Sequence, residues 1–142
     1  MTEEPQTNGE RIRQFHLAMG GTLPDAPALP EIDTLIVRRT LIDEEYAEVT
    51  AVFNHIFSAR QRGEDIDITP LIHELTDLLY VTYGAFWACG VDPDPIFAEV
   101  HRANMQKANG PRRADGKVLK PAGWQPPDVA GAIQRQGQQP EN

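Results

Sequence analysis

The sequence contains a single cysteine, few basic residues and no long hydrophobic run. Cys89 cannot form a disulfide within the chain, which is typical of proteins from a reducing compartment. No apolar run approaches the roughly 20 residues that a membrane-spanning helix needs. The first residues also lack the basic and apolar segments of a signal peptide. We therefore expect a cytoplasmic protein that is not inserted in a membrane.

Positive charge is scarce except near the C-terminus. The net charge of −8 disfavours binding of polymeric nucleic acid, because neutralising its phosphates requires a basic surface. Residues 1–101 hold 18 acidic and 6 basic residues, whereas residues 102–142 hold 3 acidic and 7 basic ones. An acidic body with a basic tail would suit a metal site and an anionic small ligand. On charge alone, a solvated acidic surface with a loose tail is the simpler explanation.

Strand patterns are nearly absent, and the hydrophobic residues follow the helical period. The 142 residues are enough for one domain. We predict an all-α helical bundle of about four main helices. They span residues 8–19, 33–62, 69–90 (with Thr69 as N-cap) and 92–108. Residues 111–142 form an irregular basic C-terminal arm with a short helix after Asp128.

The second and third predicted helices carry the hydrophobic pattern that should build the core. The second has a continuous apolar stripe, which we expect to be buried: Leu35, Ile42, Val49 and Ile56, with Tyr46 and Phe53 beside them. The third helix is apolar on two sides, so it should lie at the centre of a bundle or against another subunit. We therefore predict a homodimer or a higher homo-oligomer.

Acidic residues gather on the same two helices, at Glu44, Glu45 and Glu48 and at Glu74 and Asp77. A helical wheel puts Glu45 on the buried side of its helix, with Glu74 and Asp77 flanking the core stripe of the other. Carboxylates gathered at the edge of a core repel one another and lose solvation, so a cation should lie among them.

The chemistry of the side chains indicates which cation this would be. Carboxylate oxygens, with no cysteine and no histidine facing the same way, favour a hard ion such as Mg²⁺ or Mn²⁺. The alternative is a set of solvated acids paired with arginines, for which the candidates are Arg38, Arg39 and Arg60.

The spacing of these acids is similar to a known signature. Glu44-Glu45-x-x-Glu48, 25 residues, and then Glu74-x-x-Asp77 resembles the EExxE…ExxD pattern of the MazG-like all-α nucleoside triphosphate pyrophosphohydrolases. Segments 99–107, 115–120 and 123–128 resemble in particular the members that prefer dUTP. The resemblance extends from about Phe15 to Asp128.

The resemblance implies hydrolysis of a nucleoside triphosphate, with dUTP as the expected substrate, to the monophosphate and pyrophosphate, as a step in nucleotide-pool housekeeping. By position, Glu45, Glu48, Glu74 and Asp77 would bind Mg²⁺, for which Mn²⁺ can substitute, and Glu44 would orient or deprotonate the attacking water. This division agrees with phosphoryl transfer in general, where metals neutralise phosphate oxygens and position the nucleophile.

Candidate substrate-binding residues lie mostly in the C-terminal third. Asn104 and Lys107 share a helix face, so an amide could read a base while an ammonium holds a phosphate. Lys117 and Lys120, together with neighbouring arginines of the arm, could close over the triphosphate, and Trp124 could cover the base. The same residues would also fit a solvated tail. Two further candidates for the nucleotide pocket are Phe15, for which core packing is the more ordinary role, and His16.

Three alternatives remain open. The same chemistry could act on another substrate, such as phosphoribosyl-ATP or a damaged nucleotide. The chain could instead be a non-catalytic helical module for nucleotide binding or dimerisation. A zinc protease is suggested only by His73 and Asp77, which share a helix face, and no third zinc ligand accompanies them.

Overall fold

A computed structural model describes residues 6–138 of the chain. It contains five helices: α1 (Asn8–Ala18), α2 (Ile32–Gln61), α3 (Thr69–Ala88), α4 (Pro93–Lys107) and α5 (Val129–Gly137). Within this part, the only extended pairing is an isolated bridge between Arg112 and Val118. The prediction of an all-α fold, with a short helix following Asp128, is confirmed.

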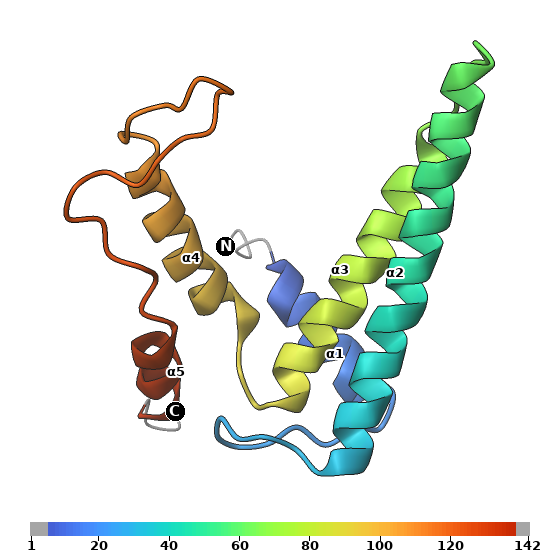
Figure 1. The fold of residues 1–142 in the computed structure, drawn as a ribbon. Coiled ribbons are helices and arrows are strands. Elements are labelled where there is room, and N and C mark those ends of the chain that lie inside the picture. Colours follow the sequence, from blue (N-terminus) through green and yellow to red (C-terminus); the bar gives the residue numbers. More distant parts are fainter. Residues whose placement is uncertain (1–5, 139–142) are drawn as a thin grey trace, which may run out of the picture.

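The helices form two groups (Figure 1). α2 and α3 are a long antiparallel pair that makes the largest contact of the fold, and α1 packs beside α3. α4 and α5 pack against each other and stand apart from α2. The loop after α4 projects beyond its C-terminal end (Figure 1). The basic residues predicted in the arm are therefore carried on the second group.

Local signals set the helix ends. The Thr7 side chain accepts a hydrogen bond from the Glu10 backbone at 3.1 Å, and Glu10 accepts one from the Thr7 backbone at 2.7 Å, so the capping box forms. Gly63 and Gly90 follow α2 and α3 with φ of 68° and 67°, a conformation that glycine adopts without strain. The predicted N-cap of the third helix is wrong by one position, because Ile68 precedes its first helical residue.

The apolar stripe of α2 is only partly buried. Leu35, Ile42 and Ile56 are half-buried against α3 and Val49 is buried, as predicted. The predicted burial of Tyr46 and Phe53 is wrong within one chain, since they are 63% and 36% exposed. The physical reason is that α3 is the only helix that packs along α2 in the described residues, so most of the surface of α2 away from α3 is left uncovered.

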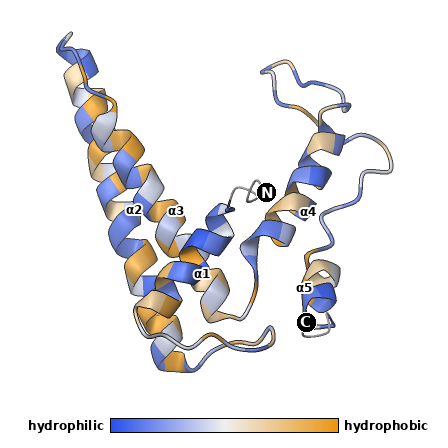
Figure 2. Ribbon diagram, turned by 180° about the vertical axis from the view of Figure 1, so that it is seen from behind, coloured by the Kyte–Doolittle hydropathy of each residue, from blue (hydrophilic) through white to orange (hydrophobic). Residues whose placement is uncertain are grey.

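Hydrophobic side chains therefore remain on the surface of the α2–α3 pair. Figure 2 shows hydrophobic residues on more than one side of both helices. The exposed ones include Ile32, Ile36, Val37, Tyr46, Phe53, Phe57, Ile72, Leu79 and Tyr80. Among the described residues, no helix is both long and apolar enough to cross a membrane.

The α4–α5 group has a small core, against which Phe86 at the end of α3 also packs, and several polar contacts of its own. Val91, Ile96 and Ala132 form a buried cluster. The Glu99 carboxylate accepts two hydrogen bonds from Arg102, at 2.7 and 2.9 Å, and one from the Asp128 backbone, at 2.8 Å. These bonds lower the pKa of Glu99 to about 2. Glu99 therefore holds the end of the arm, at Asp128, against α4.

Candidate metal centre and nucleotide site

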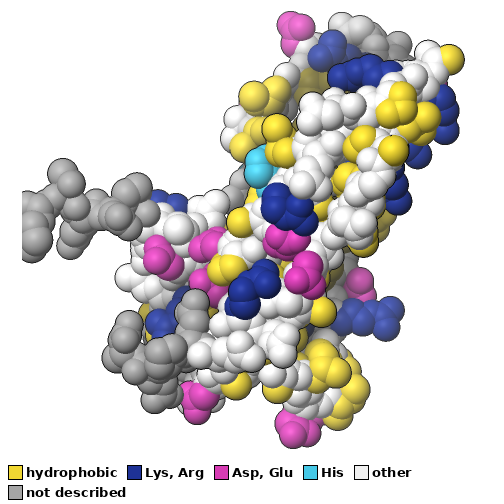
Figure 3. All heavy atoms as spheres, turned by 90° about the vertical axis from the view of Figure 1, so that its left-hand side faces the viewer, with side chains coloured by type: hydrophobic (Ala, Val, Ile, Leu, Met, Phe, Trp, Pro, Cys, Tyr) yellow, Lys and Arg dark blue, Asp and Glu magenta, His cyan; other side chains and the backbone are white. Residues whose placement is uncertain are grey.

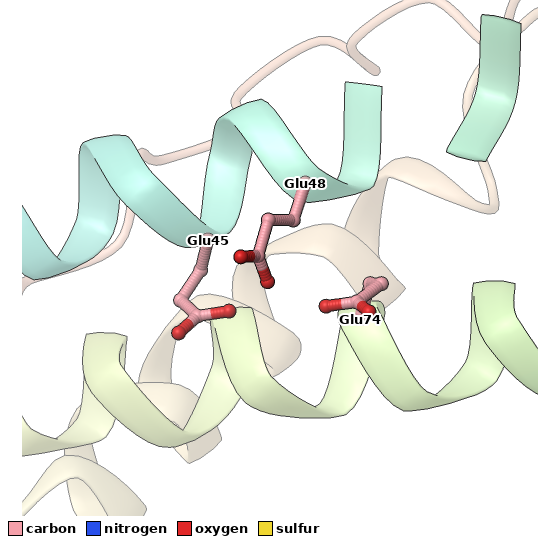
Figure 4. Close-up of side chains that lie close together, drawn as sticks. All are labelled: Glu45, Glu48 and Glu74. Atoms are coloured by element: carbon pink, nitrogen blue, oxygen red, sulfur yellow. The ribbon is translucent and has the colours of Figure 1, made fainter. Parts of the chain in front are cut away.

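Three carboxylates converge between α2 and α3 (Figure 4). Glu45 and Glu48 are three residues apart and so share a face of α2, and Glu74 lies opposite them on α3. One carboxylate oxygen of each lies within 4.8 Å of the others. Three of the four predicted metal ligands are thus brought together by the antiparallel pairing of the two helices.

These carboxylates have too few hydrogen-bond donors around them. One oxygen of Glu45 and one of Glu74 are buried without a hydrogen-bond partner. Burial raises the pKa of Glu45, and the neighbouring charges of Glu48, Asp77 and Glu74 raise it further. Burial also raises the pKa of Glu74, with Glu48 as the next cause. A cation among these oxygens would relieve both the desolvation and the repulsion.

Asp77, the fourth predicted ligand, stands at the edge of the cluster. Its carboxylate lies 3.1 Å from Nε2 of His73, one helical turn earlier on α3. The prediction that no histidine faces the acids is therefore wrong, because the i,i+4 spacing puts His73 and Asp77 on one face. The charge of Asp77 nevertheless contributes to the raised pKa of Glu45, so it lies near the cluster.

Arginines do not neutralise the cluster. Among the described residues, no arginine forms an ion pair with Glu45, Glu48 or Glu74. Arg39 instead pairs with Asp43 of its own helix at 3.4 Å. Pairing with arginines, which the alternative requires, is therefore not observed for these three. A set of carboxylate oxygens fits a hard divalent cation such as Mg²⁺ or Mn²⁺.

Glu44 occupies a different position from its neighbour Glu45. It is exposed and points about 100° away from Glu45, but it lies one helical turn before Glu48 on the same face of α2, so it stands beside the three converging carboxylates. It is not one of the three residues whose oxygens meet. Its role toward the attacking water remains a prediction.

Several predicted substrate-binding residues form a second cluster, on α4 and the arm. The ammonium groups of Lys107 and Lys120 lie 4.7 and 4.8 Å from the ring centroid of Trp124. The Trp124 indole donates a hydrogen bond to the Ala103 carbonyl at 2.8 Å, which fixes the ring on α4. Asn104 and Lys117 are exposed, and each is three residues before one of these lysines in the sequence. We refer to Lys107, Lys120 and Trp124 as the basic cluster.

The basic cluster and the acidic cluster do not meet within one chain. The two are carried by the separate helix groups of Figure 1, and neither α4 nor α5 packs against α2 in the described residues. Within one copy the arm therefore does not lie over the acids, and its closure over the triphosphate stays a prediction.

The two candidates on α1 point to different places. His16 lines a cavity of about 540 Å³ between the end of α1, the loop over residues 20–31 and the start of α2, together with Thr34 and Arg38. Phe15 is not part of that lining, and its ring packs edge-on against Tyr80 at a centroid distance of 5.4 Å. From the sequence, Arg38 is predicted only as a possible partner for the acids. Its spacing of seven residues from Glu45 was the signal that both share one face of α2.

Comparison with known proteins assigns the family. A search of curated proteins found no match. The family described as phosphoribosyl-ATP pyrophosphohydrolase matches residues 12–104. The matched region covers α2 and α3 and hence the whole acidic cluster, and it ends within α4, before Lys120 and Trp124 of the basic cluster. The chain belongs to the phosphoribosyl-ATP pyrophosphohydrolase family, one of the MazG-like all-α nucleoside triphosphate pyrophosphohydrolases.

Proposed function

We propose that this protein hydrolyses a nucleoside triphosphate to the monophosphate and pyrophosphate with the help of Mg²⁺ or Mn²⁺. One observation carries the proposal: Glu45, Glu48 and Glu74 converge within 4.8 Å, and two of their buried oxygens have no hydrogen-bond partner. These three residues would hold the metal, and Asp77 would join them by exchanging its contact with His73 for the ion.

The chemistry divides between the metal and the chain. When bound, the metal neutralises phosphate oxygens and lowers the barrier to attack by water. The carboxylates hold it between the two helices. Glu44, exposed beside them, accepts the proton of the attacking water at a carboxylate oxygen. The bond from water to phosphorus forms as the bond between the α- and β-phosphate groups breaks, and pyrophosphate leaves.

Two substrates have specific support. The family match favours phosphoribosyl-ATP, an ATP that carries a second, phosphorylated ribose on its base. dUTP is the second candidate, because segments 115–120 and 123–128 resemble dUTP-preferring proteins, and both lie beyond the family match. The basic cluster, which is proposed to hold the phosphates, thus lies outside the family match.

We also propose that the working unit is a homodimer or larger. The α2–α3 pair exposes hydrophobic side chains that a second copy could bury (Figure 2). Figure 3 shows the side of the molecule that carries α4, α5 and the arm, with Lys and Arg side chains exposed over its upper part. A second copy could also bring its basic cluster to the acids of the first, where opposite charges would attract.

Release of pyrophosphate should be measured across the deoxynucleoside triphosphates, ATP and phosphoribosyl-ATP, each with Mg²⁺, with Mn²⁺ and with a chelator. We expect turnover of dUTP or phosphoribosyl-ATP that depends on the metal. Release of orthophosphate in place of pyrophosphate, or turnover unaffected by the chelator, would contradict the proposal. Metal and nucleotide binding without any turnover would support the non-catalytic alternative.

A further inference from the structure

A glycine on α3 makes room for two side chains that lie far apart in the sequence. A Cβ added to Gly84 would lie 3.0 Å from Nε2 of His16 and 3.2 Å from Nη1 of Arg38. Nη2 of Arg38 in turn lies 3.5 Å from Nδ1 of His16. The Arg38 guanidinium and the His16 imidazole therefore both lie in a notch on α3. A residue larger than glycine at position 84 would fill this notch.

The guanidinium in this notch lacks an acceptor of adequate strength. Among residues 6–138, its buried Nε has no hydrogen-bond partner, and the one hydrogen-bond contact of the guanidinium is the long one to His16. Burial lowers the pKa of His16, and the charge of Arg38 lowers it further, so the ring is neutral at neutral pH and is no counter-ion. A partly desolvated guanidinium without an acceptor is unfavourable.

The position of Arg38 connects it to the acidic cluster. Arg38 precedes Glu45 by seven residues, which is two helical turns, so both lie on one face of α2 about 10 Å apart along its axis. Arg38 also lines the cavity of about 540 Å³ beside α1. A nucleotide whose phosphates lie at Glu45 and Glu48 could extend its nucleoside end into this cavity.

We propose that Arg38 determines substrate specificity by hydrogen-bonding an acceptor oxygen at the nucleoside end of the substrate. A guanidinium has donors only, so it pairs with a base carbonyl or a phosphate and not with an amino group. The acceptor would be a uracil carbonyl in dUTP or the far phosphate of phosphoribosyl-ATP. This inference rests on the proposed function and adds a residue to it.

Two pairs of nucleotides can show which of these two acceptors Arg38 binds. dUTP and dCTP differ by a carbonyl and an amino group at the same ring position, whereas phosphoribosyl-ATP and ATP differ by the phosphoribosyl group. For each pair, the ratio to measure is kcat/KM for the nucleotide that carries the acceptor divided by kcat/KM for the one that lacks it. We expect Arg38→Ala to lower this ratio by about tenfold or more in one of the two pairs, because a site built for a hydrogen bond rejects a partner that cannot form it. The loss should appear in KM, with kcat little changed. The pair that responds identifies the acceptor.

Arg39→Ala is the matched control. It removes the same charge from the adjacent position, where the side chain is 84% exposed and pairs with Asp43. Gly84→Ala is an independent variant that should displace the guanidinium while retaining it, and so shift the same ratio. Arg38→Lys keeps the charge but loses the planar set of donors, and should restore the ratio only in part.

Three outcomes decide the matter. Unchanged ratios within both pairs for Arg38→Ala and Gly84→Ala, with parent turnover intact, would overturn the role of Arg38 and leave the proposed function standing. If Arg38→Ala lowers the melting temperature but leaves the kcat/KM ratios unchanged, Arg38 has a structural role, and the proposed role in specificity is likewise overturned. If the parent neither hydrolyses nor binds any of the four nucleotides, both proposals fail.

Discussion

Glu45 on α2 and Glu74 on α3 face each other across the helix pair, with carboxylate oxygens no more than 4.8 Å apart. Each has one oxygen that is buried without a hydrogen-bond partner, and burial raises the pKa of both groups. Two anions placed in this way are costly unless a cation or a proton joins them.

Replacing Glu45 with Gln should weaken Mn²⁺ binding at least about tenfold, since even the loss of groups that support a metal ligand costs that much. Titration calorimetry with Mn²⁺ measures the change. Asp65→Asn is the control, because it removes one charge from an exposed position in the loop between α2 and α3. Equal affinity in the parent and in Glu45→Gln would exclude Glu45 as a ligand.

The Glu44→Gln variant should lose turnover and keep metal binding largely intact, because Glu44 lies outside the three converging carboxylates. Turnover is followed as pyrophosphate release and metal binding by the same Mn²⁺ titration. If this variant hydrolyses substrate at the parent rate, the role assigned to Glu44 toward water is wrong.

The metal-free protein should lose stability as the pH rises above 4.5, the ordinary value for Glu. The pKa values of Glu45 and Glu74 are raised in the folded state, so in this range the native protein holds protons that the unfolded chain has released. The contribution of these two groups to the free energy of unfolding should therefore be highest at the acidic end of the range. It is measured by urea denaturation between pH 4.5 and 7 in the presence of a chelator.

The double variant Glu45→Gln/Glu74→Gln provides the comparison, because other groups also contribute. Burial raises the pKa of Asp92, which adds a dependence of the same sign, and lowers the pKa of His16, which adds one of the opposite sign. The difference between parent and variant isolates the cluster. Adding Mn²⁺ to the parent should remove the decline in stability with rising pH. A parent that becomes more stable than the variant as the pH rises without metal would contradict the pKa directions.

Leu79→Arg should convert the protein to a monomer and abolish turnover. Leu79 is 56% exposed on α3, on a surface that we propose a second copy covers. A charge there would have to be desolvated on association. Light scattering measures the mass, and Gln14→Arg, on the exposed side of α1, is the control. A monomeric parent that retains full activity would refute the oligomer.

Lys107→Ala and Lys120→Ala should each raise KM for the nucleotide severalfold, because each removes a point charge proposed to hold phosphate. Steady-state kinetics at two salt concentrations test this, since the parent should lose more affinity at high salt than the variants. Arg62→Ala removes a charge just beyond the end of α2 and should leave KM unchanged. If KM is unchanged in both lysine variants, the lysines of the basic cluster do not hold phosphate and only pack against Trp124.

The sequence was sufficient to predict the helices and the candidate ligands. Helix ends depend on neighbouring residues, such as the Thr7 and Glu10 capping box and Gly63, and these interactions operate within a few positions of the chain. The spacing of Glu45 and Glu48 puts them on one helix face in any fold that keeps α2. Family membership likewise follows from sequence alone.

Only the tertiary structure decided which side chains meet. The approach of Glu74 to Glu45 depends on the register of α2 against α3, and the contact of Arg38 with His16 depends on a glycine that lies 46 positions further along the chain. The exposure of Tyr46 depends on α4 and α5 lying away from α2. Such distances result from packing between helices that are remote in sequence. The periodicity of a single helix cannot predict them.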